Sequence, residues 1–149
     1  MKCGEKMSVL HKKVISNELA EKMIMKAKEK AEELNIAVNI AIVDNGGHLV
    51  AFSRMDDAPI LSIDISQNKA YTAIAFGIPT HEWYPLIDKS PALKTGIVHT
   101  SRLVVFGGGY PIKLDGQVIG GIGVSGGSEE EDRLCCEAAL QVLNHVLQK

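Results

Sequence analysis

The segment from Val104 to Gly127 reads VVFGGGYPIKLDGQVIGGIGVSGG, two short apolar runs joined at Asp115-Gly116. Glycine recurs at its start, within its second run and at its end. Because glycine has no Cβ, a backbone so rich in it can turn tightly and approach a neighbouring segment or a ligand at short distance. The segment therefore predicts a strand hairpin that packs closely against another part of the molecule.

Gly121, Gly123 and Gly126 match the G-x-G-x-x-G spacing of a dinucleotide-binding turn. That fingerprint opens a βαβ unit and is followed by an acidic residue about twenty positions later. Here only one helix follows, and its first turn carries four acids that would repel a pyrophosphate: Glu129, Glu130, Glu131 and Asp132. We therefore interpret the first two glycines as strand residues in close backbone contact, and Ser128 with Glu131 as a capping box.

Length and composition fit one domain over residues 1–149, with 46% hydrophobic residues. A chain of this size buries about two-thirds of its unfolded surface and needs no disulfide or metal to fold. The net charge of −2, with both signs interspersed, argues against nucleic acid as a partner. We expect no membrane contact, because no apolar run is long enough to span a bilayer and the start, MKCGEKM, is not a signal peptide. Cys3 and the adjacent Cys135-Cys136 offer no disulfide framework, which favours a reducing cytoplasm.

Apolar residues at three- and four-residue steps indicate amphipathic helices. We expect helices over Asn17–Leu34, from Ser62 or Ile63 to Phe76, and over Glu129–Leu147. Ser16 is placed to cap the first helix, and Gly77 with Pro79 to end the second. One face of the last helix carries Leu134, Ala138, Val142 and Val146. We also expect Thr80 to cap a short helical turn and Lys89–Ser101, which has no sustained period, to form a surface loop.

Runs rich in β-branched and aromatic residues predict five strands: Ile36–Val43, His48–Ser53, Leu103–Phe106, Tyr110–Leu114 and Gln117–Val124. Asn45-Gly46 is expected to supply the positive φ angles of the first hairpin, and Asp115-Gly116 to turn the last. The element order gives an α+β domain with a mainly antiparallel sheet. Its strands are apolar on both faces, and only three long helices are available to cover them, so we expect a homo-oligomer.

Three blocks of the chain, IVDNGGHLVAFSRMDDA, DISQNKAYTAIAF-x-x-PTHEW and FGGGYPI-x-x-DGQVIGGIGVSGGSEEED, follow one another in this order. From about Leu19 onward, they resemble the GlcG/HbpS family of haem-binding or haem-degrading domains and the C-terminal domain of PduO-type proteins. The resemblance implies a profilin-like fold with a five-stranded antiparallel sheet, assembly into homo-oligomers, and binding of haem or a corrinoid. No adenosyltransferase domain precedes the matching region, so we do not expect that activity.

His81 is the preferred candidate for a metal ligand. Haem needs an axial ligand and a large apolar slot. Thr80 would fix the turn that carries His81, while Trp83 and Tyr84 would supply an aromatic wall. The alternative is an exposed histidine near a helix N-terminus with no ligand. The other histidines that keep the choice of axial ligand open are His99, His11 and His48, whereas His145 is expected on the solvent side of the last helix.

Lys69 lies among apolar residues of the second helix, where a lysine is held by a carboxylate or by an acidic group of a ligand. We expect Asp44, at the hairpin end, to be its partner in a structural tie; the functional alternative is contact with a carboxylate of haem or a corrinoid. Gly107, Gly108 and Gly109 expose backbone amides that could receive an anionic group. For these glycines we prefer a strand-to-strand corner.

No catalytic motif is present: the sequence has no H-E-x-x-H, no G-x-S-x-G and no P-loop. Adjacent Cys135 and Cys136 would point about 100° apart on a helix and could not chelate one ion together. The resemblance to the GlcG/HbpS family implies a tetrapyrrole-binding accessory or sensor domain, with diol, glycerol or glycolate metabolism as a candidate setting. Two alternatives stay open. One is a haem-degrading or corrinoid-reducing enzyme that uses His81 and Lys69, and the other is a structural assembly protein without a ligand.

Overall fold

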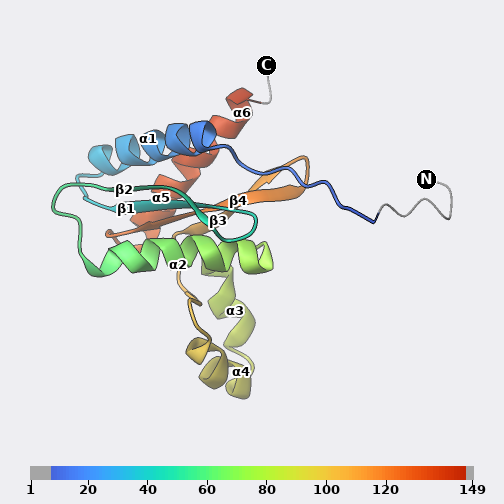
Figure 1. Cartoon of the computed structure of the whole chain (residues 1–149). Coiled ribbons are helices and arrows are strands. Elements are labelled where there is room, and N and C mark those ends of the chain that lie inside the picture. The colour runs from blue at the N-terminus through green and yellow to red at the C-terminus, as the bar shows by residue number, and fades with distance from the viewer. Residues whose placement is uncertain (1–7, 147–149) are drawn as a thin grey trace.

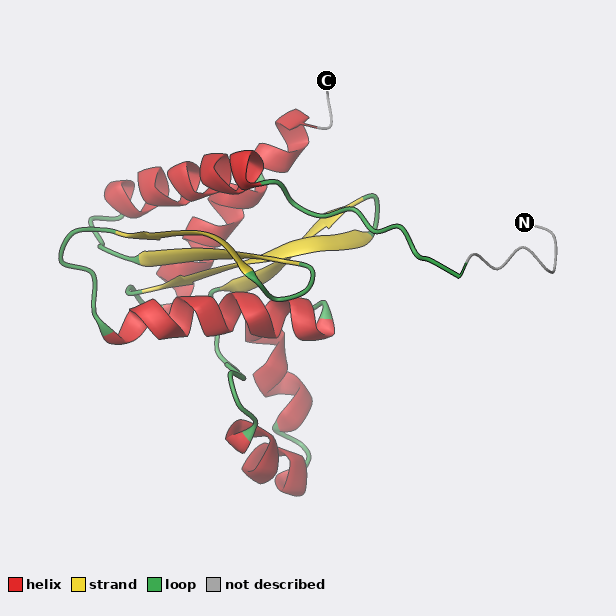
Figure 2. Ribbon diagram, in the orientation of Figure 1, coloured by secondary structure: helices red, strands yellow, loops and turns green. Residues whose placement is uncertain are grey.

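The computed structural model describes residues 8–146, which fold into an α+β arrangement of three layers (Figures 1 and 2). Its elements in chain order are α1 (Asn17–Glu33), β1 (Asn39–Asp44), β2 (Leu49–Arg54), α2 (Leu61–Phe76), η1 (Thr80–Glu82), α3 (Trp83–Ile87), α4 (Pro91–Gly96), η2 (Ile97–His99), β3 (Gly109–Leu114), β4 (Gln117–Ser125), α5 (Glu129–Leu140) and α6 (Val142–Val146). The strands form one antiparallel sheet in the order β2-β1-β4-β3. Helix α2 covers one face, and α1 with α5 covers the other.

The two faces of β4 carry different side chains, because successive residues of a strand point to opposite sides of the sheet. Ile122 and Val124 are fully buried in the core beneath α1 and α5, together with Met23 and Cys136. Burying an aliphatic side chain of this size contributes about 1.5–3 kcal/mol. This face of the sheet therefore supplies the main hydrophobic core.

On the opposite face of β4, Gly121 and Gly123 lie directly against α2. A Cβ on Gly121 would come 2.6 Å from the Ala70 carbonyl oxygen, and one on Gly123 would collide with the Ser66 carbonyl oxygen. Both glycines lie within a strand that pairs with β1 and β3. The expected close backbone contact is thus confirmed, and these residues do not form a turn that could hold a dinucleotide.

Lys69 is 1% exposed and forms a buried ion pair with Asp132 of α5, at 3.0 Å. Its ammonium also donates a hydrogen bond to the Val124 carbonyl oxygen at 2.8 Å. The other carboxylate oxygen of Asp132 accepts from the backbone N–H of Gly127 at 2.9 Å. The ring of Phe106 lies 5.2 Å from the ammonium. This pair therefore links α2, β4 and the start of α5.

Asp44 is not the partner of Lys69, so that prediction is wrong. Its carboxylate accepts hydrogen bonds from the N–H groups of Gly46 at 2.9 Å and His48 at 3.0 Å, and thereby organises the turn between β1 and β2. The positive φ in this turn, 87°, belongs to Gly47 and not to Asn45 or Gly46. The carboxylate that we expected to reach α2 is used within its own turn.

Most predicted helix and hairpin ends are confirmed. The Ser16 hydroxyl accepts from the Leu19 N–H at the start of α1, and Gly77 ends α2 with a φ of 69°. The capping box that begins at Ser128 is present. Asp115 and Gly116 turn the last hairpin with φ angles of 51° and 77°. These features depend on residues close together in the sequence.

Within residues 8–146 the sheet has four strands and not five, because Leu103–Phe106 is not a strand. The N–H of Val104 donates to the Thr72 hydroxyl oxygen at 3.0 Å, and that hydroxyl donates to the Arg102 carbonyl oxygen at 2.9 Å. A side chain of α2 thus satisfies backbone groups that a neighbouring strand would otherwise bind.

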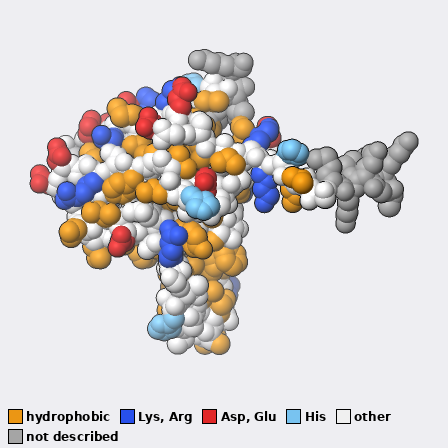
Figure 3. All heavy atoms as spheres, viewed as in Figure 1, with side chains coloured by type: hydrophobic (Ala, Val, Ile, Leu, Met, Phe, Trp, Pro, Cys, Tyr) orange, Lys and Arg blue, Asp and Glu red, His pale blue; other side chains and the backbone are white. Residues whose placement is uncertain are grey.

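The expected loop Lys89–Ser101 contains α4 and η2, which with α3 form an arm that projects from the layered body (Figure 1). Pro91 begins α4, a position that suits its fixed φ and missing N–H. Apolar side chains stay exposed on the arm, among them Tyr84, Leu86, Leu93 and Val98. Figure 3 shows hydrophobic side chains on the surface of the arm. Charged side chains of both signs are interspersed over the body.

The predicted last helix is interrupted at Gln141, between α5 and α6. Its predicted end, Leu147, and the cysteine at position 3 lie outside the described residues. Cys135 and Cys136 are buried free thiols. Within residues 8–146, no helix is both long and apolar enough to cross a bilayer. The chain's own helices cover both faces of the sheet, so the sheet by itself does not require a partner subunit.

Replacing Gly123 with alanine should lower the free energy of unfolding by about 1–3 kcal/mol, because the added Cβ forces α2 away from the sheet. Urea unfolding measures this loss. Gly96→Ala is the matched control, since a Cβ there meets no atom within 4 Å. Equal stability of the two variants would contradict the close packing of α2 on β4.

Replacing Lys69 with methionine should cost about 3–5 kcal/mol, because Asp132 would be left buried without its partner. The double variant Lys69→Met/Asp132→Leu should lose less stability than Lys69→Met alone, since no unpaired charge remains. Equilibrium unfolding in urea compares the two. A double variant less stable than the single one would show that the pair contributes net stability beyond charge neutralisation.

Candidate functional site

His81 lies in η1, where this turn meets β3 and α5. Its ring packs against that of Tyr110, with centroids 5.6 Å apart and planes tilted by 55°. Its Nδ1 atom is buried and has no hydrogen-bond partner among residues 8–146. The protein therefore leaves the hydrogen-bonding capacity of one imidazole nitrogen unused.

Thr80 positions His81, but not as the predicted N-cap. The residue that precedes η1 is Pro79, and Thr80 is itself the first residue of the turn. Thr80 is fully buried, and its hydroxyl oxygen accepts from the Gly109 N–H at 2.9 Å. This hydrogen bond attaches η1 to the start of β3 and thereby fixes the position of the backbone that carries His81.

Trp83 and Tyr84 do not form the expected aromatic wall around His81. Trp83 is buried and packs edge-on against Phe76, with ring centroids 4.7 Å apart. Tyr84 is half exposed and stacks with Lys94 on the arm. The aromatic neighbour of His81 is Tyr110, which comes from a strand almost thirty residues later in the chain.

Two cavities meet at His81. One, of about 590 Å³, is lined by His81, Ser128, Glu129, Glu130, Arg133, Leu134 and Glu137. The other, of about 450 Å³, is lined by Ile78, His81, Glu82, Pro85 and Leu86 at the base of the arm. The first is rich in charged groups and the second is mainly apolar. Together they can receive a ligand with an apolar body and polar edges.

The surroundings of His81 favour its neutral imidazole. Burial lowers its pKa, and the nearby Arg133 guanidinium lowers it further, against weaker opposing effects from neighbouring glutamates. A neutral imidazole keeps a lone pair that can bind a metal. Burial also raises the pKa of Tyr110 to about 12, and its hydroxyl donates to Glu137 at 2.8 Å. The shifts favour the neutral imidazole of His81 and the protonated phenol of Tyr110.

The triple glycine forms a corner in which the N–H groups of Gly107 and Gly109 are already bonded. The N–H of Gly107 donates to the Glu129 carboxylate at 2.6 Å, and the N–H of Gly109 donates to Thr80. Gly108 has a φ of 118°, in the region that favours glycine. An anionic ligand at Gly107 would have to displace Glu129. The preferred interpretation as a corner agrees with this geometry.

Lys69 does not face either cavity, because Asp132 and a backbone carbonyl occupy its ammonium. The cation that lines the His81 cavity is Arg133, which we did not predict. Its position four residues after Glu129 and four before Glu137 places all three on one face of α5. That spacing was readable in the sequence, but the proximity of this face to His81 was not.

The other histidines lie apart from this site. His11 is exposed and lines a separate cavity of about 480 Å³ together with Lys12 and Lys13. His48 binds Asp44 at 3.2 Å, His99 is exposed on the arm, and His145 lies at the groove between α1 and α5. In the part of the chain that the structure describes, no three His, Cys, Asp or Glu side chains are grouped to hold a metal ion.

Residues 15–141 match the model of the haem-degrading HbpS-like protein family. An uncharacterized 15.0 kDa protein from the dhaT-dhaS intergenic region of Citrobacter freundii is 43% identical over 128 residues, which cover 85% of this chain and 90% of that protein. The corrinoid adenosyltransferase PduO of Salmonella typhimurium is 38% identical over 119 residues, 79% of this chain but only 35% of PduO. The crystal structure of a PduOC:haem complex has a TM-score of 0.79 and 33% identity, covering 88% of this chain and 96% of that one.

The pKa of His81 should lie below 6.5, and Arg133→Gln should raise it, because the variant removes one of the two causes of the depression. NMR titration of the imidazole Cε1–H resonance measures both values. The folded state resists protonation of His81, so stability should fall as the pH drops from 6.5 toward the folded pKa. Arg54→Gln, whose side chain instead binds the Ala58 carbonyl, is the control. A pKa of His81 that Arg133→Gln leaves unchanged would contradict the assigned cause.

Proposed function

The chain belongs to the family of haem-degrading HbpS-like proteins, and we propose that it binds a tetrapyrrole, haem or a corrinoid, where the two cavities meet at His81. The observation that carries the proposal is the imidazole of His81, at a charged and an apolar cavity, whose lowered pKa favours the neutral form and whose buried Nδ1 has no hydrogen-bond partner among residues 8–146. The PduOC:haem complex supports haem as the ligand, and the relative PduO, a corrinoid adenosyltransferase, supports a corrinoid.

The side chains present fit the needs of such a ligand. A tetrapyrrole offers a metal, a flat apolar body and polar edge groups, and when bound it would supply the redox chemistry of its metal. His81 would serve as the metal ligand. Ile78, Pro85 and Leu86 would contact the apolar body, and Arg133 would attract a carboxylate at its edge.

The other residues that we predicted to contact the ligand have structural roles next to the site. Thr80 fastens η1 to β3, and Gly107 holds Glu129 at the cavity wall. Lys69 lies beneath Gly108, so close that a Cβ on this glycine would come 2.6 Å from the ammonium. Trp83 anchors the arm that carries the apolar cavity. We infer that these residues shape the site without touching the ligand.

We propose an accessory or sensor role rather than catalysis. Burial raises the pKa of Tyr110 to about 12 and lowers that of His81, so the protonated phenol and the neutral imidazole are favoured, which suits a binding site better than proton transfer. The alternatives are haem degradation or corrinoid reduction, and an assembly role without a ligand.

We further propose that the protein is a cytoplasmic homo-oligomer. The buried free thiols Cys135 and Cys136 fit a reducing compartment. Apolar side chains exposed on the arm, such as Leu86 and Val98, fit contact with another subunit.

Haemin added to the purified protein should give a Soret band, and His81→Ala should weaken binding at least about tenfold and shift that band, because the iron would lose the histidine proposed to hold it. His145→Ala should bind like the unchanged protein, since His145 lies at a different groove. Spectral titrations with haemin and with cobalamins measure these affinities. Loss of the band when a reductant is added would favour the enzyme alternative.

Two outcomes would contradict parts of the proposal. If His81→Ala kept the spectrum and affinity while His11→Ala or His99→Ala abolished them, the ligand assignment would be wrong but tetrapyrrole binding would stand. If neither haemin nor a cobalamin bound, the proposed function would be wrong and the assembly role would replace it.

A further inference from the structure

The charged cavity at His81 holds more carboxylates than cations. Among the described residues, its walls contain one guanidinium, that of Arg133, and three carboxylates, those of Glu129, Glu130 and Glu137. The imidazole of His81 adds no positive charge, since its lowered pKa favours the neutral form. The cavity is therefore negative overall, although Arg133 is the group to which a ligand carboxylate would bind.

Glu129 is held at the cavity wall next to Arg133. Its carboxylate accepts a hydrogen bond from the Gly107 N–H at 2.6 Å. A Cβ on Gly107 would come 2.8 Å from Cγ of Glu129 and 2.9 Å from Cδ of Arg133, so both side chains lie over this glycine. Arg133 follows Glu129 by about one helical turn, which places the two side chains on the same side of α5. The glycine corner thus keeps a negative charge beside the guanidinium.

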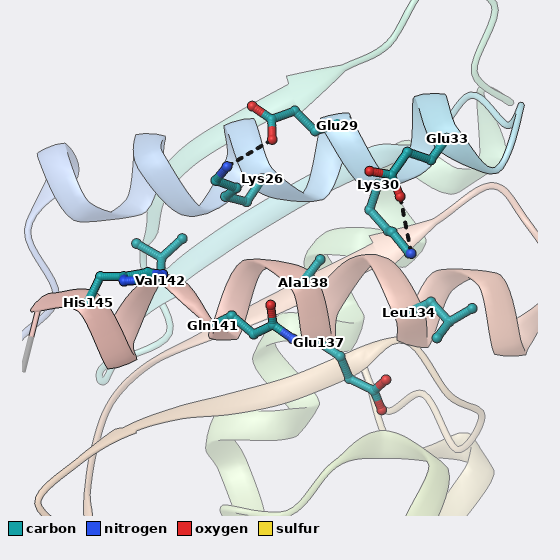
Figure 4. A pocket seen from close by; sticks show the side chains of 10 residues that line it. All are labelled: Lys26, Glu29, Lys30, Glu33, Leu134, Glu137, Ala138, Gln141, Val142 and His145. Carbon is teal, nitrogen blue, oxygen red and sulfur yellow. Dashed lines mark hydrogen bonds and ion pairs between the residues drawn. The ribbon is translucent and has the colours of Figure 1, made fainter.

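Glu137 lies on the other side of Arg133, about one turn further along α5. Its carboxylate accepts a hydrogen bond from the Tyr110 hydroxyl at 2.8 Å. Figure 4, which views the groove between α1 and α5, shows the Glu137 side chain directed away from α1. The Tyr110 hydroxyl, and after it Glu137 and Glu129, raise the pKa of the Arg133 guanidinium. Two carboxylates of its own helix therefore balance this cation before any ligand binds.

We propose that Glu129 limits how strongly the site binds a ligand carboxylate, and thereby determines which edge groups of a tetrapyrrole the site accepts. A bond between Arg133 and a ligand carboxylate gains less energy when a carboxylate of the protein already balances the guanidinium. A neutral amide at the ligand edge is not disfavoured in this way, because it carries no charge that Glu129 would repel. The inference rests on the proposed function, since it concerns the specificity of the same site.

Glu129→Gln tests this role, because it removes the charge and keeps an oxygen that can accept from the Gly107 N–H. The variant should bind haemin, which carries free carboxylates, at least about threefold more tightly than the wild type. Haemin dimethyl ester and dicyanocobinamide carry no free carboxylate, so their affinities should change by less than about twofold. Spectral titration of the full chain at low salt measures these affinities, and added salt should reduce the gain for haemin.

Glu130→Gln is the matched control, because it makes the same change of charge in the same cavity. Glu130 is exposed, and within residues 8–146 no hydrogen bond holds its carboxylate. This variant should therefore gain less affinity for haemin than Glu129→Gln. In an Arg133→Gln background, Glu129→Gln should also gain less, since no guanidinium remains for Glu129 to balance. Far-UV circular dichroism establishes that each variant is folded.

The wild-type chain gives a second test that needs no variant. Haemin should bind it no more than about threefold more tightly than haemin dimethyl ester, because the carboxylates of haemin meet a guanidinium that is already balanced. A preference for haemin of more than about tenfold would show that Arg133 is free to bind a carboxylate, and would overturn the proposal.

Three results with the variants would also overturn it: an unchanged haemin affinity in Glu129→Gln, equal gains in Glu129→Gln and Glu130→Gln, or a gain as large for the dimethyl ester as for haemin. Equal gains would mean that only the overall charge of the cavity matters. These results differ from a failure of the proposed function. If none of the three probes bound the wild type, tetrapyrrole binding would be wrong together with this inference, whereas unchanged affinities would overturn this inference alone.

Discussion

The buried ion pair between Lys69 and Asp132 is the contact on which the rest of the arrangement depends. A charge taken out of water is costly unless it is paired and its remaining hydrogen-bonding groups are satisfied. Here the ammonium has the carboxylate and a β4 carbonyl, and the carboxylate also has the Gly127 N–H. Satisfying both charges fixes α2, β4 and the first turn of α5 relative to one another.

The triple-glycine corner, Gly107–Gly109, connects the buried ion pair with the candidate site. Gly108 passes directly over the buried ammonium, where a side chain would have no room. Its neighbours on either side then bind Glu129 of α5 and Thr80 of η1. The corner therefore sets the first turn of α5 against the turn that carries His81. The proposed metal ligand and the proposed carboxylate-binding Arg133 owe their proximity to residues that face neither cavity.

Helix α5 serves three regions of the molecule with three of its sides. Asp132 and Cys136 point into the interior, Arg133 and Glu137 line the cavity at His81, and Ala138 belongs to the groove beside α1. Leu134 and Glu137 line both the cavity and the groove.

The sequence by itself determined what depends on neighbours along the chain: the helix ends at Ser16 and Gly77, the Asp115-Gly116 turn, the close contact of Gly121 and Gly123, and the family. It did not determine which distant groups meet. Lys69 pairs with Asp132 and not Asp44, the Thr72 hydroxyl keeps Leu103–Phe106 out of the sheet, and Tyr110 and Arg133 complete the surroundings of His81. Local propensity and periodicity act over a few residues, whereas these contacts join segments about thirty to sixty residues apart. Only the packing of α2 and α5 on the sheet decided them, because burial requires each polar group to find a partner wherever the fold brings one.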